Sequence, residues 1–213
     1  LTSPMARRLL QMFSEGVDFL YGMLFHDTFK LHPTLHAEET SLEFPEDVIT
    51  IAMHVRHTKV ENTGAVLSQE EQGCLEAVVN ETRVGRPGAT SCAIFLMSDR
   101  QESLNALTQL ASAMNCSAVV TSHTKKGEII NLEHGPFAGL GFFQDLLVAG
   151  KARDGYVGHC GRSSSQMLQE IIQYGRVNGQ SEGKISNNRP FTQCCLSTEK
   201  FKAGKKNIND PPP

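Results

Sequence analysis

The sequence predicts an α/β protein built on a parallel sheet with helices on both faces. Four short apolar runs recur between residues 48 and 159, and a segment of helical pattern follows each run. The runs are almost continuously apolar, whereas a strand with one solvated face alternates apolar and polar residues. Polar residues gather where the runs end, and parallel sheets bind ligands at those carboxyl ends.

The composition is that of an ordinary globular chain. Its 213 residues are 39% hydrophobic and 20% charged, with a net charge of −3, and this length suits one sizeable domain with an attached segment. The charge balance does not predict nucleic acid as a partner. No apolar run reaches the length of a membrane span, and the chain starts at Leu1 without a signal-peptide pattern. We therefore expect a fragment or a processed form, with any membrane attachment in a segment outside this sequence.

The first part of the chain is expected to form a helical segment and a loop ahead of the sheet. Apolar residues recur at broadly helical spacing through residues 4–25, and prolines at positions 33 and 45 mark a loop at 31–47. The first predicted strand is Val48–Val55. It is rich in β-branched residues, which favour strands, and it runs directly into the charged stretch HVRHT at 54–58.

The middle of the chain holds two more strand–helix units. Ser68 and Glu71 have the spacing of a capping box, which predicts a helix that ends at about Glu81. The apolar run CAIFLMS then predicts a strand at 92–98. The pattern that follows predicts a helix at 101–114, a strand at 117–122 and a polar loop at 123–135.

The last strand–helix unit follows that loop. Residues 137–149 have a helical pattern despite their glycines, and GYVGH predicts a short strand at 155–159. Ser163 or Ser164 then caps a helix that ends near Gly175.

These elements define the expected domain organisation. Residues 1–47 form the N-terminal helical segment and loop, and residues 48–177 form the sheet domain. Residues 178–213 are polar, rich in Gly, Asn and Lys, and end in three prolines. That composition predicts a mostly disordered tail.

Arg56 follows the carboxyl end of the first predicted strand. Side chains alternate along a strand, so His54 and Arg56 share one face, while Val55 and His57 take the other. The forked donors of an arginine suit a phosphate group bidentately. A phosphate site at the ligand crevice is one interpretation of Arg56, and a surface ion pair is the other. The histidines are candidates for a pocket, with a structural role as the alternative.

Two further features could bind a ligand. The stretch GRSSSQMLQEII, 161–172, combines a glycine, three serines and an amphipathic helix. Free N–H groups at a helix N-terminus form anion sites, and ordinary capping is the alternative. Asp145 lies within the apolar stretch GLGFFQDLLVAG. A buried carboxylate needs a partner, and guanine offers adjacent N–H donors at N1 and N2; an exposed helix position is the alternative.

Several common sites have no matching pattern in the sequence. The chain lacks the GxSxG turn of serine hydrolases, and it lacks both GxxxxGK[ST] and GxGxxG phosphate loops. None of its cysteines forms a CxxC pair, so no zinc or other metal site is predicted. There is also no D-x-D pair to hold a metal on a nucleotide diphosphate. If the protein binds such a diphosphate, cationic side chains and helix dipoles must neutralise it.

Taken in order, these motifs resemble those of GT-B fucosyltransferases, namely the α1,6-fucosyltransferase group and its protein O-fucosyltransferase relatives. That group has a strand ending in His-Val-Arg-Arg-Thr, here HVRHT, and a Ser-Asp after a later strand, here in MSDRQESL. It then has an aspartate-containing helix, an Ala-Asp before a short strand and a Ser-Ser-Gln opening a helix. These correspond to GFFQDLLVAGKARDGYVGHCGRSSSQMLQEII. The resemblance covers about residues 48–174 and implies a Rossmann-like sheet, similar to the C-terminal nucleotide-binding domain of a GT-B glycosyltransferase.

The resemblance implies a role for each matching residue. Arg56 would contact the β-phosphate of GDP-fucose and stabilise the departing GDP, His54 would line the nucleotide pocket, and Asp145 would read guanine. The diphosphate would be held where the last helix begins, by Ser163, Ser164, Ser165 and Gln166. The implied reaction is a metal-independent, inverting transfer of fucose from GDP-fucose, the donor substrate, to a glycan or glycoprotein hydroxyl, without a cofactor.

The chain departs from that family at several positions. His57 replaces the second arginine of the motif, although a protonated histidine can still donate to a phosphate. Lys59 replaces the next acidic position. The base that deprotonates the acceptor is carried by no motif; Glu61 is our first candidate, and Asp99, also a candidate substrate-binding residue, is the second. The family's acceptor domain comes first in the chain, and residues 1–47 are interpreted as its remnant.

Two alternatives stand beside the transferase interpretation. The first is a non-catalytic module of the same fold that binds a nucleotide sugar or a glycan. The second is a different doubly wound enzyme in which Arg56 binds another phosphate.

Cysteines and sequons suggest the compartment. An even number of six cysteines permits disulfides. The triplets Asn80-Glu81-Thr82 and Asn115-Cys116-Ser117 match the N-glycosylation pattern. Together with the resemblance, these features predict a protein of the secretory pathway, in the Golgi lumen, where disulfides persist.

Overall fold

A parallel sheet forms the centre of the protein, as the apolar runs predict, and it has five strands where four were expected. The computed structural model describes residues 44–55, 66–98, 100–120, 145–160, 163–181, 185–186 and 188–197. The strands are β1 Val48–Val55, β2 Ser91–Ser98, β3 Ser117–Val119, β4 Gly155–Gly158 and β5 Thr192–Cys195. Their order is β3-β2-β1-β4-β5, and every neighbouring pair is parallel. The fold is therefore a Rossmann-like α/β arrangement.

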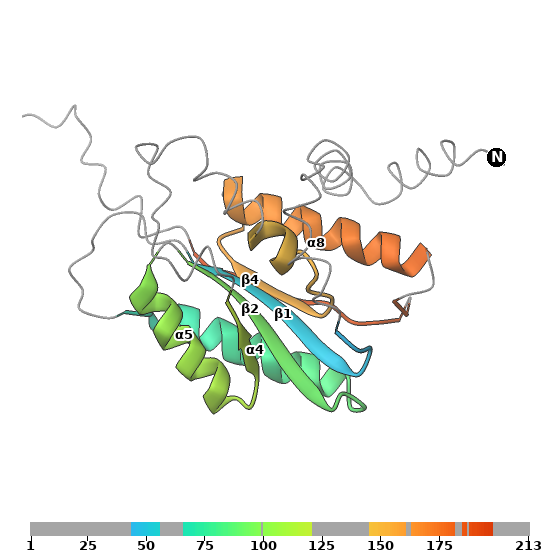
Figure 1. Ribbon diagram of the computed structural model, residues 1–213, viewed down its shortest axis with the longest axis horizontal. Helices are drawn as coiled ribbons and strands as arrows, with labels where there is room; N and C mark the ends of the chain where they lie inside the picture. The colour runs from blue at the N-terminus through green and yellow to red at the C-terminus, as the bar shows by residue number, and fades with distance from the viewer. Residues whose placement is uncertain are drawn as a thin grey trace, which may run out of the picture.

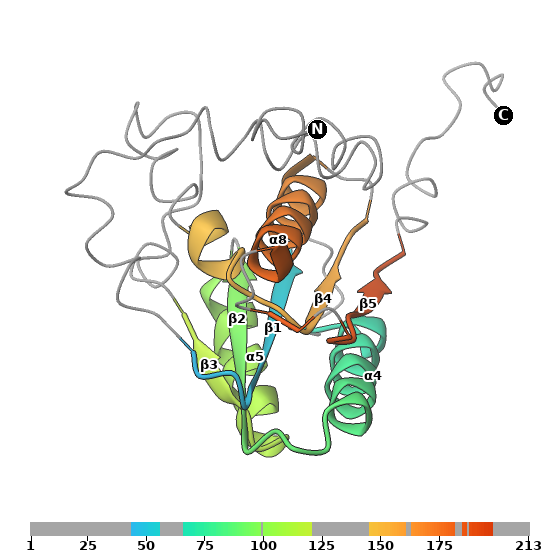
Figure 2. The ribbon, with the colours of Figure 1, turned by 90° about the vertical axis from the view of Figure 1, so that its right-hand side faces the viewer.

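Helices cover both faces of this sheet. Helices α4, Gln69–Gly85, and α5, Gln101–Ala113, lie on one face. Helix α8, Ser163–Ser181, and the short helical stretch at 145–149 lie on the other (Figures 1 and 2). None of the helices in the described ranges is long and apolar enough to cross a membrane.

Two apolar cores fill the space between the three layers. The larger core joins alternate residues of β1 and β2 to the inner faces of α4 and α5, and it includes Ile51, Leu75 and Leu107. The second core joins the opposite face of the sheet to α8, and it includes Phe95 and Leu168. Because β1 and β2 are covered on both faces, their sequences are continuous apolar runs and do not alternate between apolar and polar residues.

The capping box predicted for the first covering helix is confirmed. Ser68 Oγ accepts a hydrogen bond from the backbone N–H of Glu71, and the Glu71 carboxylate accepts from the backbone N–H of Ser68 at 2.6 Å. The helix continues to Gly85, one turn beyond the predicted end at Glu81, and there the backbone N–H of Arg86 donates to the Arg83 carbonyl.

The prediction of a disordered tail from residue 178 is wrong for two stretches. Helix α8 passes Gly175 and runs to Ser181. Ile185 packs closely against Gly179, where a Cβ would lie 2.6 Å from Ile185 Cδ1. Residues 192–195 form β5, which pairs with β4. The prediction missed this strand because four residues of mixed polarity carry little periodicity.

All six cysteines form disulfides. The pairs are Cys74–Cys194, Cys92–Cys116 and Cys160–Cys195. Cys74–Cys194 joins α4 to β5, and Cys160–Cys195 joins the segment just after β4 to β5. These two disulfides hold the last strand in the sheet.

Other predicted elements are confirmed in part. The third strand is shorter than predicted: it ends at Val119, whereas the prediction placed its end at residue 122. Residues 145–149 are helical, as predicted for the end of the 137–149 helix. The remaining predicted elements lie outside the described residues: the helix at 4–25, most of the loop at 31–47, the loop at 123–135 and residues 137–144 of the 137–149 helix.

Candidate functional site

The sheet has a topological switch point beside its central strand. From β1 the chain continues to β2 and β3 on one side, and it later returns to β4 and β5 on the other (Figure 2). In such sheets the connecting helices lie on opposite faces, which leaves a crevice at the carboxyl ends of the two diverging strands. His54 and Gly158 are paired at those ends. His54, the first residue of the HVRHT motif, therefore lies at the position where this fold class binds ligands.

A buried hydrogen bond joins two of the predicted motifs at this edge. The Nδ1 atom of His54, on β1, lies 2.8 Å from the Ser165 hydroxyl, in the first turn of α8. His54 is 5% exposed and Ser165 is 1% exposed. The two residues are 111 positions apart in the sequence. The fold therefore places His54 of the HVRHT motif against Ser165 of the serine-rich stretch, and the buried hydroxyl fixes the orientation of the imidazole ring.

Tyr156 holds the start of α8 in place from the other strand of the switch point. Its hydroxyl donates to the Ser165 carbonyl at 3.0 Å. Burial raises the pKa of Tyr156 to about 12, so the phenol remains a donor at neutral pH. Gly158 makes room for this contact, because a Cβ there would lie 2.2 Å from the Tyr156 hydroxyl. The strand ends of β1 and β4 are thus both tied to Ser165.

Helix α8 begins at Ser163, so Ser163 and Ser164 lie within its first turn rather than ahead of it. The first N–H groups of a helix have no partner inside the helix and are available to an anion. The exposed side chain of Gln166 donates from Nε2 to the Glu170 carboxylate at 3.0 Å. Gln166 would have to leave that contact to reach a ligand.

Asp145 is buried on the α8 face of the sheet. It is 7% exposed and lies in the helical stretch 145–149, in which the neighbouring Leu146 is part of the second core. The alternative of an exposed helix position is therefore wrong. A buried carboxylate close to the sheet fits the expected role in base recognition, and that role stays a prediction.

The remaining predicted site residues lie outside the described residues. They are Arg56, His57, Glu61 and Asp99, together with Lys59. Arg56 and Asp99 directly follow the last residues of β1 and β2, Val55 and Ser98, which are paired in register.

Sequence reasoning missed a buried ionic cluster at the opposite, amino-terminal edge. Asp154 is fully buried just before β4, and its carboxylate receives hydrogen bonds from Arg189 at 2.6 and 2.8 Å and from Arg86 at 3.0 Å. The backbone N–H of Thr50 also donates to it at 2.7 Å. Burial alone would raise the pKa of Asp154, but the bonds from Arg189 and Thr50 hold it below its ordinary value.

Two more arginines complete this cluster by binding backbone carbonyl groups. Arg153 donates to the carbonyls of Phe44 and Pro45, and Arg176 donates to those of Arg153 and Arg189. Burial lowers the pKa of Arg176 to about 10. The cluster ties β1, β4, α8 and the segment before β5 together, so its role is structural. No local sequence pattern could have revealed it, because its partners are 35 and 68 positions apart.

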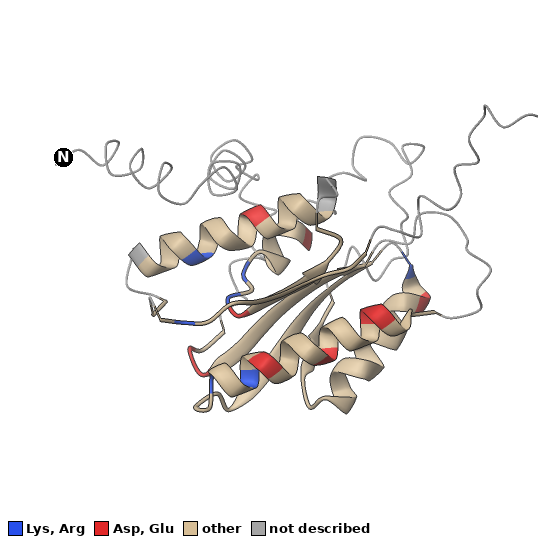
Figure 3. Ribbon diagram, turned by 180° about the vertical axis from the view of Figure 1, so that it is seen from behind, with Lys and Arg blue, Asp and Glu red and all other residues tan. Residues whose placement is uncertain are grey.

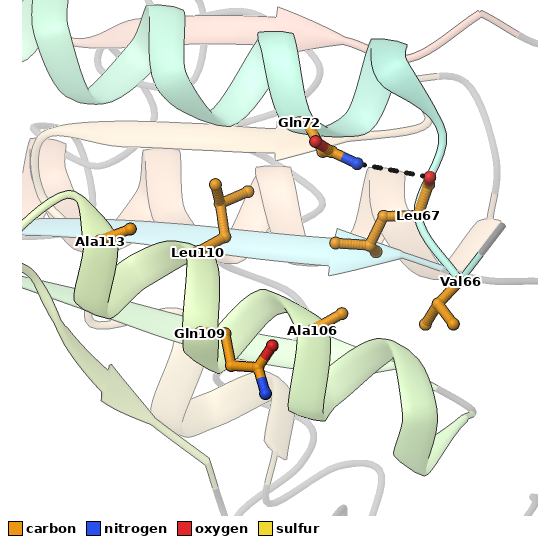
Figure 4. Close-up of a pocket in the computed structure, with 7 residues that line it drawn as sticks. All are labelled: Val66, Leu67, Gln72, Ala106, Gln109, Leu110 and Ala113. Carbon is orange, nitrogen blue, oxygen red and sulfur yellow. Dashed lines mark hydrogen bonds between the residues drawn. The ribbon is translucent and has the colours of Figure 1, made fainter.

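An open groove of about 510 Å³ lies between α4 and α5, on the face away from α8 (Figure 4). Its lining is apolar apart from two glutamines: Val66, Leu67, Gln72, Ala106, Gln109, Leu110 and Ala113. Acidic residues are distributed along the neighbouring α4 (Figure 3). None of the described residues that line this groove carries a positive charge for a diphosphate, so the candidate nucleotide site remains the carboxyl edge.

Comparison with known proteins gives no family assignment. No protein-family model matches the chain, and no curated protein matches it. Within the described ranges, no group of three or more His, Cys, Asp or Glu residues is placed to hold a metal ion.

Proposed function

We propose that the protein is a glycosyltransferase domain that uses GDP-fucose. It would act as a metal-independent, inverting fucosyltransferase that moves fucose to a glycan or glycoprotein hydroxyl. The hydrogen bond between His54 and Ser165 carries the proposal, because it brings two motifs of the fucosyltransferase resemblance to one edge of the sheet. That edge is also where a Rossmann-like sheet binds nucleotides.

The reaction needs charge stabilisation at the diphosphate. As the acceptor oxygen bonds to the anomeric carbon of fucose, the bond from that carbon to the β-phosphate oxygen breaks, and GDP leaves with the electron pair. The acceptor's proton passes to a base, for which Glu61 is the first candidate and Asp99 the second. Arg56 and the first N–H groups of α8 would stabilise the charge that develops on GDP.

Recognition of the base would depend on Asp145. A carboxylate accepts hydrogen bonds from guanine N1 and N2, whereas adenine presents no such pair of donors. The buried position of Asp145 strengthens such bonds, because the local dielectric is low. The three disulfides support the expected secretory location, since an oxidising lumen maintains such bonds.

The release of GDP from GDP-fucose tests this proposal. With a panel of glycan and glycoprotein acceptors, the wild-type chain should release GDP, and Arg56→Ala should abolish release while the circular dichroism spectrum stays unchanged. Arg100→Ala is the matched control, because Arg100 also follows a strand of the sheet and should leave release intact. Unchanged turnover in Arg56→Ala would refute the assignment.

GDP release, measured together with GDP binding, separates an enzyme from a binding module of the same fold. Saturable GDP binding without GDP release, with every acceptor, would select the non-catalytic alternative. Asp145→Asn should weaken GDP far more than pyrophosphate, because only GDP carries the base. Equal weakening of both ligands would make Asp145 a structural residue.

A further inference from the structure

The turn between α5 and β3 presents an asparagine sequon on the surface. Helix α5 ends at Ala113, and Asn115 follows with a φ of 54°. The backbone N–H of Asn115 donates to the Ser112 carbonyl, and that of Cys116 donates to the Ala111 carbonyl. These two bonds form a Schellman motif, in which the left-handed position favours glycine or asparagine. The motif turns the chain sharply, so the Asn115 side chain is exposed.

The left-handed backbone conformation explains why an asparagine occupies position 115. It does not explain why a serine follows two positions later, at 117. Ser117 is the first residue of β3 and is exposed, which completes an accessible Asn-Cys-Ser triplet. Cys116 lies between them and points inward, where it is bonded to Cys92. Both polar side chains that define the sequon therefore face solvent, while the middle residue anchors the turn.

From this geometry we propose that Asn115 carries an N-linked glycan when the chain is made in the secretory pathway. The inference needs passage through that pathway, which the paired cysteines support, but it does not need transferase activity. N-glycans occupy surface loops and turns of secreted proteins.

The second sequon lacks this geometry. Asn80 lies in the interior of α4, a 17-residue helix with a complete capping box. Its third residue, Thr82, is only 1% exposed, and the segment has the regular hydrogen bonding of a helix rather than a turn. The structure therefore assigns the glycan to Asn115 and not to Asn80.

The surroundings of Asn115 leave space for a glycan. The turn lies at the amino-terminal edge of the sheet, because α5 runs back from the carboxyl end of β2 to the start of β3. Figure 4 shows this polarity: Ala113 lies toward the tail of the β1 arrow, and Val66 lies beyond its head. β3 is also the outermost strand on its side of the described sheet. A glycan there would not obstruct the crevice at the carboxyl edge.

The attachment is a group transfer from a polyprenyl-diphosphate oligosaccharide. The Asn115 amide nitrogen bonds to the anomeric carbon of the oligosaccharide, and the bond from that carbon to the diphosphate oxygen breaks. The polyprenyl diphosphate leaves with the electron pair, and the amide loses one proton.

The test uses the full chain behind a cleavable secretion signal, made in cells that attach N-glycans. Protein from the secretory fraction is treated with peptide N-glycosidase, which releases the glycan and converts its asparagine to aspartate. Wild type should shift by one step on a gel, and peptide mass spectrometry should find aspartate at position 115. Asn80→Gln should shift like wild type.

Two variants remove the sequon without disturbing the turn. Asn115→Gly retains a residue that accepts positive φ, and Ser117→Ala changes only an exposed hydroxyl. Both should lose the shift completely and keep the wild-type circular dichroism spectrum. Unmodified Asn115 in wild type, a shift that persists in Ser117→Ala, or a shift that is lost in Asn80→Gln would each overturn the proposal.

Discussion

Replacing Asp154 by asparagine tests the ionic cluster that holds the amino-terminal edge together. The substitution keeps the shape of the side chain but removes its charge. Asp154 is fully buried, and its carboxylate receives hydrogen bonds from Arg189 and Arg86 as well as from the backbone of Thr50. In the variant, the introduced amide must place an N–H group against an arginine, and the buried Arg189 loses its only carboxylate partner among the described residues.

The magnitude follows from the burial of the pair. Removing one partner of a buried ion pair costs about 3–5 kcal/mol, because an uncompensated charge is left behind. With a urea slope of about 2 kcal/mol/M, the unfolding midpoint should fall by roughly 1.5–2.5 M. Asp47→Asn is the matched control: Asp47 accepts a hydrogen bond from Thr90 at an exposed site, and such surface contacts contribute about 0–1 kcal/mol.

Urea unfolding followed by circular dichroism measures both variants, and its pH dependence provides a second readout. Because the pKa of Asp154 is held below its ordinary value in the folded state, its contribution to stability is present above that ordinary value. The contribution is lost as the pH falls through the lowered pKa, and Asp154→Asn should lack this part of the acid dependence. A loss in Asp154→Asn no larger than that in Asp47→Asn would refute the structural role of the cluster.

The tyrosine contact and the disulfides lead to further expectations. Tyr156→Phe removes the hydrogen bond that the phenol donates to the Ser165 carbonyl and should cost about 0.5–1.5 kcal/mol in urea unfolding. It should also abolish a loss of stability in wild type as the pH rises from 10 through about 12, and an identical alkaline profile would count against the raised pKa. Gly158→Ala should cost about 1–3 kcal/mol, because its Cβ would lie 2.2 Å from the Tyr156 hydroxyl; an unchanged midpoint would show that the ring can move away freely. Removing Cys74–Cys194 by paired alanine substitutions should cost about 5 kcal/mol, and removing Cys92–Cys116 about 3.5 kcal/mol, because the first closes a separation of 120 residues and the second of 24. The reverse order of the two losses would contradict this chain-entropy account.

The fold class could be predicted because it depends on local patterns. Strands β1 and β2 are buried on both faces, so each is a continuous apolar run, and the capping box of α4 is contained within four residues. The short β5 could not be predicted in this way. Its four residues are held by pairing with β4 and by two disulfides whose partners are distant in the sequence.

The candidate site could be predicted only at the level of motifs. The placement of His54 and the serine-rich helix start at strand ends followed from the order of elements, and the bond between His54 and Ser165 is the contact that this placement makes available. The supporting contacts could not be foreseen. Tyr156 reaches Ser165 only because Gly158 has no side chain, and Asp154 meets Arg189 only in the folded chain.

Binding of GDP is the most direct test of the proposed nucleotide site. A ligand that binds only the folded state raises its stability in proportion to the logarithm of ligand concentration, by about 2.7 kcal/mol at one hundred times Kd. In a thermal-unfolding titration, GDP should raise the Tm in a dose-dependent way, and ADP should not. No shift with GDP at high concentration, or an equal shift with ADP, would contradict the account.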